Sequence, residues 1–159
     1  MKLLIIDDER PILDMLELSL SEEGYNVLTA ENGEKGLEMF RKHAPKLVLT
    51  DVKMPGIDGI EVLKRIKAIN NEAEVIVITG HGDMETAIAA LQHHASDFVT
   101  KPIRDEVLIL SLDRAKKRLA MSEQIKTYTD NLEQKIESCR LELLQAQEEV
   151  IKTERRASI

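Results

Sequence analysis

Three acidic residues in this sequence follow short apolar runs, and their type and spacing suit metal-assisted chemistry. Asp7 and Asp8 follow the run Leu3–Ile6, and Asp51 follows the run Leu47–Thr50. Carboxylates that converge repel one another strongly unless a cation neutralises them. Oxygen ligands without sulfur or imidazole suit Mg²⁺, which binds through one or two carboxylates plus a phosphate. The pattern therefore indicates a Mg²⁺ site.

Two further residues supply the groups that phosphoryl transfer needs. Thr79 ends the run Val75–Thr79, and Lys101 follows the run Phe98–Thr100. One of the carboxylates can attack phosphorus to give an aspartyl phosphate. The hydroxyl of Thr79 and the compact ammonium of Lys101 can then hold the phosphoryl oxygens.

Each of these signals is weak when taken singly. A pair of aspartates after a strand is often only a solvated turn, and Lys101 before Pro102 is compatible with a simple surface charge. The joint placement at the ends of separate strands, in the correct order, is what is improbable by chance. The interpretation requires that the side chains meet around one cation and that the carboxylate of Asp51 stays open to solvent.

Residues 1–104 alternate between short aliphatic runs and segments with helical spacing, which predicts a doubly wound parallel sheet. The runs Leu47–Leu49 and Val75–Ile78 are continuously apolar, as expected for strands that helices cover on both faces. Parallel strands end at one edge of the sheet, where such folds form their sites. The expected strands are Leu3–Ile6, Val27–Thr29, Leu47–Thr50, Val75–Thr79 and Phe98–Thr100.

Composition and charge exclude several classes of protein. The 159 residues are 43% hydrophobic but only 3% aromatic, so aliphatic side chains must fill a core. The net charge of −7 disfavours direct binding to nucleic acid. The single cysteine, Cys139, excludes an intrachain disulfide and fits a reducing compartment. Because acidic residues interrupt the apolar start at Asp7, and no run approaches the length of a membrane span, we expect a cytoplasmic chain.

Residues 105–159 contain no Gly or Pro and predict one long helix. It should start near Arg104 and bury Leu108, Leu112 and Ala115 against the sheet. Farther on, an apolar stripe at coiled-coil spacing predicts a parallel homodimer, and a helix that folds back on its own domain is the alternative. The stripe, which has a stutter between its fourth and fifth members, consists of Met121, Ile125, Tyr128, Leu132, Ile136, Cys139, Leu143, Ala146 and Val150.

Residues 1–120 closely resemble response regulator receiver domains, whereas residues 121–159 are expected to be a coiled-coil helix or linker. The matching stretches are I-I-D-D-E at 5–9, L-V-L-T-D-V-K-M-P-G-I-D-G at 47–59, V-I-V-I-T-G at 75–80 and D-F-V-T-K-P at 97–102. The resemblance implies a flavodoxin-like (βα)5 fold with strand order 2-1-3-4-5. It also implies that a histidine kinase or phosphotransfer protein phosphorylates the domain.

The resemblance implies roles for individual residues. Asp51 is the phosphorylation site, and Thr79 and Lys101 contact the phosphoryl group. Asp7, Asp8 and Asp51 hold Mg²⁺ together with the backbone carbonyl of Lys53.

Other positions are implied to govern switching and the lifetime of the phosphoryl group. Phe98 takes the place of the switch aromatic and acts with Thr79, and the Lys101–Pro102 peptide bond is expected to be cis. Lys53 and His81 stand at positions that tune dephosphorylation. Because neither is an acid that would activate water, we expect slow to moderate self-dephosphorylation.

The sequence leaves the output of the signal open. Residues 144–159, L-Q-A-Q-E-E-V-I-K-T-E-R-R-A-S-I, resemble the lead-in to the dimerising helix of sensor histidine kinases. We therefore expect a fragment of a longer protein, such as a hybrid histidine kinase. A receiver that regulates cyclic-dinucleotide or phosphohydrolase activity is an alternative. No enzymatic activity beyond self-phosphorylation and self-dephosphorylation is predicted.

Other classes of protein fit the sequence less well. A phosphatase of the haloacid-dehalogenase type needs a second aspartate where Lys53 stands. A flavodoxin-like FMN protein needs a phosphate loop where Asp7 and Asp8 stand. The basic cluster Arg114–Arg118 is short for a zipper-type DNA binder and joins an acidic domain. A purely structural coil would leave the acids at the strand ends unexplained.

Overall fold

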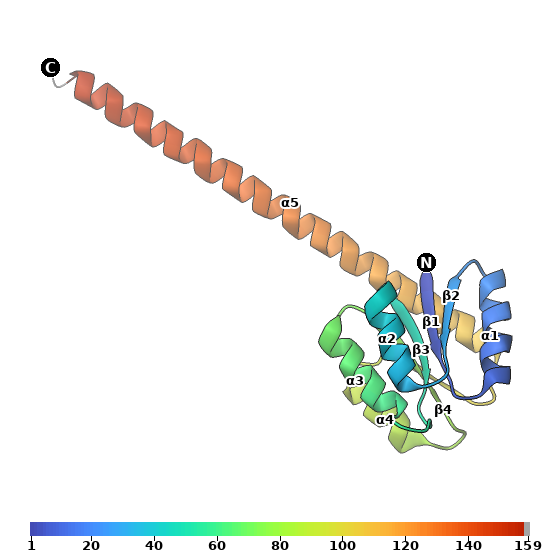
Figure 1. Ribbon diagram of the computed structural model, residues 1–159. Coiled ribbons are helices and arrows are strands. Elements are labelled where there is room, and N and C mark those ends of the chain that lie inside the picture. Colours follow the sequence, from blue (N-terminus) through green and yellow to red (C-terminus); the bar gives the residue numbers. More distant parts are fainter. Residues whose placement is uncertain (158–159) are drawn as a thin grey trace. The chain divides into compact units, whose positions relative to one another are not determined.

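The computed structural model describes residues 1–157 as five strands that alternate with five helices (Figure 1). The strands are β1 (Lys2–Ile6), β2 (Asn26–Ala30), β3 (Leu47–Asp51), β4 (Glu74–Thr79) and β5 (Asp97–Thr100). The helices are α1 (Arg10–Glu22), α2 (Gly33–His43), α3 (Gly59–Ile69), α4 (Met84–Gln92) and α5 (Asp105–Ala157). Residues 158 and 159, the end of the predicted coil, lie outside the described residues.

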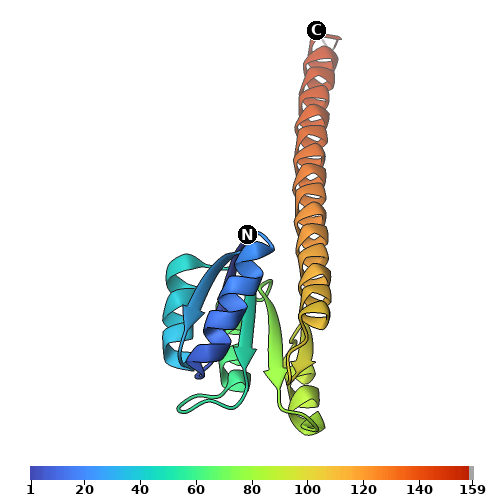
Figure 2. The same cartoon turned by 90° about the vertical axis from the view of Figure 1, so that its right-hand side faces the viewer.

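The strands form one parallel sheet in the order β2-β1-β3-β4-β5, and this confirms the predicted fold (Figure 2). In the register of β1 against β3, Ile6 pairs with Thr50. The residues that come next, Asp7 and Asp51, are therefore neighbours at the carboxyl edge of the sheet. The register thus brings together two acids that are far apart along the chain.

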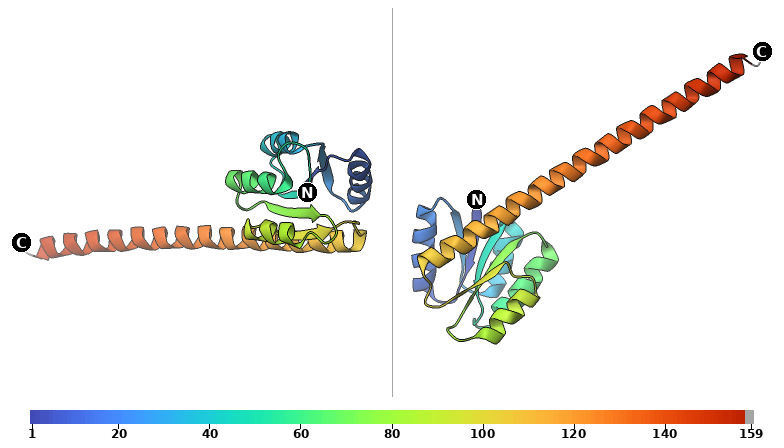
Figure 3. Two further views of the ribbon diagram at one scale, coloured as in Figure 1. Left: turned by 90° about the horizontal axis from the view of Figure 1, so that it is seen from below. Right: turned by 180° about the vertical axis from the view of Figure 1, so that it is seen from behind.

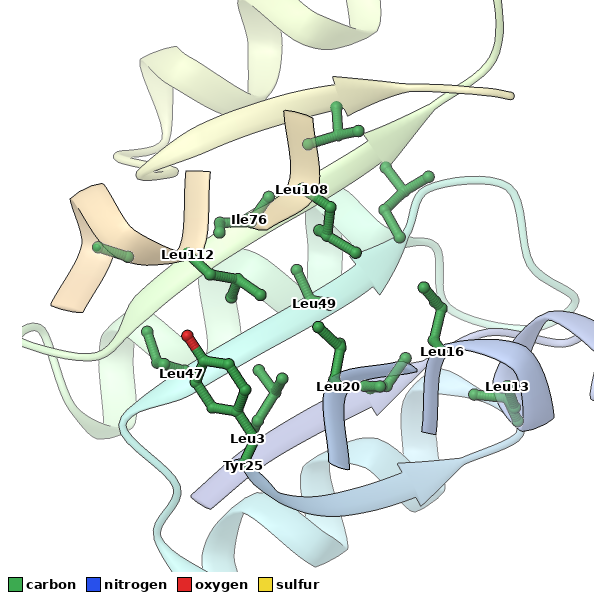
Figure 4. Packing of buried hydrophobic residues seen from close by; sticks show 14 of the residues in the cluster. Leu3, Leu13, Leu16, Leu20, Tyr25, Leu47, Leu49, Ile76, Leu108 and Leu112 are labelled. Carbon is green, nitrogen blue, oxygen red and sulfur yellow. The ribbon is translucent and has the colours of Figure 1, made fainter. Parts of the chain in front are cut away.

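Each face of the sheet has its own aliphatic core, because neighbouring side chains of a strand point to opposite faces. Leu3 and Ile5 of β1 pack with α1 and the first turns of α5, as Figure 4 shows for this cluster. Leu4 and Ile6 pack with residues of α2, α3 and α4. Seen from behind, the first turns of α5 cross the sheet (Figure 3).

Helix α5 begins at Asp105, one residue after the expected start. Leu108, Leu112 and Ala115 are buried in the first core cluster, as the sequence predicts. The two acidic residues of its first turn, Asp105 and Glu106, suit the positive end of the helix dipole.

The chain divides into two compact units, Met1–Leu119 and Ala120–Ile159. In the second unit, the side chains of the predicted coiled-coil stripe from Met121 to Val150 are exposed. The assignment of residues 1–120 to a receiver and 121–159 to a coil stays a prediction, as does the pairing of the stripe. Within residues 1–157, no helix combines the length and hydropathy needed to cross a lipid bilayer.

One glycine allows α3 to approach the end of β3. A Cβ at Gly59 would clash with the carbonyl oxygen of Asp51 and lie 2.7 Å from the Cα of Val52. The amide of Gly59 also donates to the carbonyl of Val52 at 2.8 Å. Both clashes involve backbone atoms, so a side chain here must push α3 away from the strand that carries Asp51.

We expect Gly59→Ala to lower the free energy of unfolding by about 1–3 kcal/mol, the usual cost of overpacking. Urea unfolding followed by circular dichroism measures this loss. Gly80→Ala is the matched control, because a Cβ there meets nothing within 4 Å. Equal stability of the two variants would show that the packing of α3 against β3 is not tight.

Candidate functional site

The carboxyl edge of the sheet gathers the acids that the sequence singled out. Carboxylate oxygens of Asp7, Asp8 and Asp51 lie within 4.8 Å of one another. The Nζ atom of Lys101 lies 3.1 Å from Oδ2 of Asp51 and 3.9 Å from Oδ2 of Asp7. One ammonium group therefore faces at least two carboxylates, and the cluster keeps a net negative charge.

Backbone amides fix the two buried carboxylates. The amide of Glu9 donates to Oδ1 of Asp7, and the amide of Val52 donates to Oδ1 of Asp51, each at 2.9 Å. These bonds orient the acids. Oδ2 of Asp51 accepts from Lys101, whereas Oδ2 of Asp7 has no hydrogen-bond partner. Sequence reasoning missed both amides, because their contribution depends on backbone geometry and not on side-chain type.

The exposure of Asp51 is small. Its side chain is 7% exposed, that of Asp7 is fully buried, and Asp8 beside them is exposed. Asp51 is therefore a buried residue, and the expectation that its carboxylate is open to solvent stays a prediction.

Burial changes the proton affinity of these groups. It raises the pKa of Asp7 from 3.8 to about 6, and the nearby charge of Asp51 adds to this rise, while the amide of Glu9 and the charge of Lys101 oppose it. Burial also raises the pKa of Asp51 against the hydrogen bond from Lys101. Partial burial lowers the pKa of Lys101, but its hydrogen bond to Asp51 and the nearby acidic charges together outweigh this, so the net shift is upward. Burial thus favours the neutral, protonated forms of Asp7 and Asp51.

Two buried oxygens among the described residues have no hydrogen-bond partner: Oδ2 of Asp7 and Oγ1 of Thr79. Buried polar atoms nearly always have a partner, and those that do not call for an explanation. A carboxylate oxygen among other carboxylates fits a hard divalent cation, and a buried hydroxyl can donate to an anionic oxygen. The acidic cluster is therefore consistent with a bound divalent metal.

Thr79 and Lys101 are tied together through the backbone. The amide of Lys101 donates to the carbonyl of Thr79 at 2.8 Å, and the Lys101–Pro102 peptide bond is cis, as the resemblance implies. Phe98 is partly buried in β5. In the register of β4 against β5, it pairs with Val77, two residues before Thr79.

The two residues expected to tune dephosphorylation have exposed side chains. Lys53 lines a depression beyond β3 that includes Pro55, Asp58 and Thr86. His81 lines a second depression, of about 300 Å³, that includes Lys101 and Arg104. Asp51 lines neither of them.

A polar contact between β5 and α5 was not predicted from the sequence. Asp97 lies at the start of β5 and accepts hydrogen bonds from Ser111 and Arg114 of α5. A signal was present, because Ser111 is a polar residue on the helix face that carries Leu108 and Leu112.

Comparison with known proteins identifies the family. Residues 3–113 match the family model described as a response regulator receiver domain. The chain is 40% identical over 111 residues to sporulation initiation phosphotransferase F of Bacillus subtilis, which covers 67% of this chain and 90% of that protein. It is 36% identical over 113 residues to the transcriptional regulatory protein GlrR of Escherichia coli, which covers 71% of this chain and 26% of that protein.

A similar solved structure is that of NtrX from Brucella abortus, with a TM-score of 0.75 and 35% identity over 79% of this chain and 28% of that chain. The matched region spans 26% to 47% of the first curated relatives. The likeness to these longer proteins thus concerns less than half of their length. With the family model matched over residues 3–113, the chain belongs to the response regulator receiver domains of two-component phosphorelays.

Proposed function

We propose that the chain accepts a phosphoryl group on Asp51 from the phosphohistidine of a cognate histidine kinase or phosphotransfer protein, and that the reaction depends on Mg²⁺. The observation that carries the proposal is the contact of the Asp51 carboxylate with Lys101, at 3.1 Å, inside the cluster that Asp7 and Asp8 complete. A histidine kinase partner follows from the family.

The chemistry is a displacement at phosphorus. A carboxylate oxygen of Asp51 forms a bond to phosphorus while the bond from phosphorus to the imidazole nitrogen breaks, and its electron pair leaves with the imidazole. The ammonium of Lys101 offsets negative charge on the phosphoryl oxygens. The hydroxyl of Thr79, buried without a partner, donates to one of those oxygens.

Asp7, Asp8 and Asp51, with the carbonyl of Lys53, would hold the Mg²⁺ ion. When bound, the ion offsets the charge of the phosphoryl group and of the carboxylates. Oδ2 of Asp7, which is buried without a hydrogen-bond partner, supports this assignment, since a buried charged oxygen gains most from such a ligand.

Phosphorylation then switches the surface of the domain. Thr79 moves toward the phosphoryl group, and Phe98 turns into the space that this movement opens. The surfaces of α4, β5 and α5 change as a result, because the phosphoryl group binds one of two existing states better than the other. Lys53 and His81 provide no carboxylate to activate water, so self-dephosphorylation is slow to moderate.

The helix after residue 120 pairs with the same helix of a second copy in a parallel homodimer, and the change passes along this pair of helices. An apolar stripe of seven large side chains that are each at least 42% exposed supports this pairing. These residues are Met121, Ile125, Tyr128, Leu132, Ile136, Leu143 and Val150. The acidic balance of the chain disfavours direct contact with nucleic acid.

Incubation of the full chain with acetyl phosphate and Mg²⁺ should add one phosphoryl group, and Asp51→Asn should reduce labelling to background, because the amide cannot form the acyl phosphate. Intact-protein mass spectrometry measures the labelled fraction. Asp58→Asn is the matched control: Asp58 lies in the same loop, and its side-chain oxygen caps α3 by accepting from Glu61, as an asparagine oxygen can. Labelling of Asp51→Asn at the wild-type level would refute the proposal.

In metal-free buffer, Asp7→Asn should gain stability relative to the wild type as the pH rises from about 4 to 7. The folded-state pKa of Asp7, about 6, lies above the ordinary 3.8. The folded protein therefore binds more protons within this window, and the contribution of Asp7 is full below pH 3.8 and lost as the pH rises through about 6. The difference corresponds to roughly 3 kcal/mol.

Urea unfolding of both proteins across this range measures the effect. Mg²⁺ at pH 7 should stabilise the wild type more than Asp7→Asn, because only the wild type offers that carboxylate. A stability difference that does not change with pH would contradict the proton linkage, and equal stabilisation by Mg²⁺ would contradict the role of Asp7 as a ligand.

Ile125→Glu should turn a homodimer into a monomer, because it places a charge within the apolar stripe. Sedimentation equilibrium of the full chain measures the molar mass. Thr127→Glu introduces the same charge off the stripe and should leave the dimer intact. A wild-type chain that is monomeric at micromolar concentration would argue for the alternative, a helix that folds back on its own domain.

A further inference from the structure

A single carboxylate joins strand β5 to helix α5. Oδ2 of Asp97 accepts hydrogen bonds from the hydroxyl of Ser111 at 3.0 Å and from Nη2 of Arg114 at 2.6 Å. Ser111 is 1% exposed, whereas the side chain of Arg114 is 51% exposed. The bond to Ser111 is thus the firmer part of the contact, since an exposed ion pair alone contributes little.

The same carboxylate also holds the backbone next to the proposed switch residue. Oδ1 of Asp97 accepts from the amide of Phe98 at 2.9 Å. Side chains alternate along a strand, so Asp97 and Val99 share the face of β5 that packs on α5, and Phe98 points the other way. Val99 belongs to the same core cluster as Leu108 and Leu112 of α5.

This arrangement gives a movement of Phe98 a defined route to α5. A change in the backbone at Phe98 displaces the carboxylate that its amide holds, and that carboxylate cannot move without straining or breaking its bond to Ser111. Leaving the buried hydroxyl of Ser111 without an acceptor for its proton is unfavourable. A directional bond of this kind resists slippage more than apolar packing does, because its strength falls steeply with angle.

A second polar contact holds α5 without touching Phe98. Nε of Arg118 lies 3.2 Å from Oε2 of Glu74 at the start of β4, and Glu74 also accepts from the hydroxyl of Ser96. Like the Asp97 contact, it joins an arginine of α5 to a carboxylate at a strand start. A variant that breaks this second contact therefore serves as a control: it weakens the anchoring of α5 but leaves the contacts of Phe98 unchanged.

We infer that Asp97 is a positioning residue that couples the movement of Phe98 to α5 through its hydrogen bond to Ser111. The inference rests on the proposed function, in which phosphorylation of Asp51 moves Thr79 and Phe98. Asp97 takes no part in the phosphoryl transfer itself, and its loss leaves Asp51 as reactive as before.

The test compares the full chain in four forms: wild type, Asp97→Asn, Ser111→Ala and Glu74→Gln. Each is treated with acetyl phosphate and Mg²⁺, and the phosphorylated fraction is read from the intact mass. Hydrogen–deuterium exchange is then measured, with and without the phosphoryl group, in peptides that cover α4 and β5 and in peptides that cover residues 105–119 of α5. Asp97→Asn leaves one acceptor oxygen, which cannot accept from both the amide of Phe98 and the hydroxyl of Ser111. Ser111→Ala breaks the contact from the helix side, so that the test survives if Asp97→Asn folds poorly.

We expect equal phosphorylation of all four forms and the same change in exchange at α4 and β5. In Asp97→Asn and Ser111→Ala, the phosphorylation-dependent change in α5 should fall by about fivefold or more, the lower end of usual coupling factors. In Glu74→Gln it should stay close to that of the wild type.

A full α5 response in Asp97→Asn or Ser111→Ala would overturn the coupling while leaving the proposed function intact. An equal loss in Glu74→Gln would also overturn it, because general anchoring would then explain the effect. A wild type that does not become phosphorylated, or shows no change at α4 and β5, would sink the proposed function and the coupling with it.

Discussion

Negative charge buried at the carboxyl edge of the sheet is the constraint on which the site depends. Asp7 and Asp51 are nearly or fully removed from water, and their carboxylates lie together with that of Asp8 within 4.8 Å. Taking a carboxylate out of water is costly unless opposite charge or hydrogen bonds compensate it. Lys101 and two backbone amides provide part of this compensation. The negative charge that stays uncompensated explains why the site suits a divalent cation. Such a cation can also offset the charge of a bound phosphoryl group.

The rest of the fold serves to keep these groups in place. The sheet register fixes Asp7 beside Asp51, and the cis peptide after Lys101 belongs to the short segment that leads from β5 into α5. Gly59 lets α3 pack against the backbone of Asp51 itself. The contacts that stabilise the fold therefore also hold the acidic residues in place, as is usual where a rigid scaffold carries a polar site.

Helix α5 serves two parts of the molecule through one continuous backbone. Its first turns complete the core beside α1, and its later turns expose an apolar stripe. Apolar packing alone fixes the rotation of a helix only loosely, because hydrophobic contacts are not directional. The polar contacts from Asp97 and Glu74 add the missing direction. The packing of the first turns of α5 on the sheet therefore rests on hydrogen bonds as well as on apolar contacts.

The sequence by itself determined the fold, the family and the identity of the residues at the strand ends. The aliphatic runs and helical spacings are local signals, and the rule that parallel strands end at one edge turned them into a three-dimensional expectation. The long helix and its apolar stripe could be predicted for the same reason. The predicted bounds of the five strands differ from the observed bounds by no more than one residue.

Only the tertiary structure decided how deeply each acid is buried, which oxygens lack partners and which residues hold α5. The carboxylate of Asp51 meets Lys101, fifty positions away along the chain, and the hydroxyl of Thr79 is buried without a hydrogen-bond partner. Asp97 and Ser111 are fourteen positions apart and meet only when β5 and α5 pack together. Burial and hydrogen bonding are properties of such long-range neighbours, and the pattern along the chain does not encode them one residue at a time.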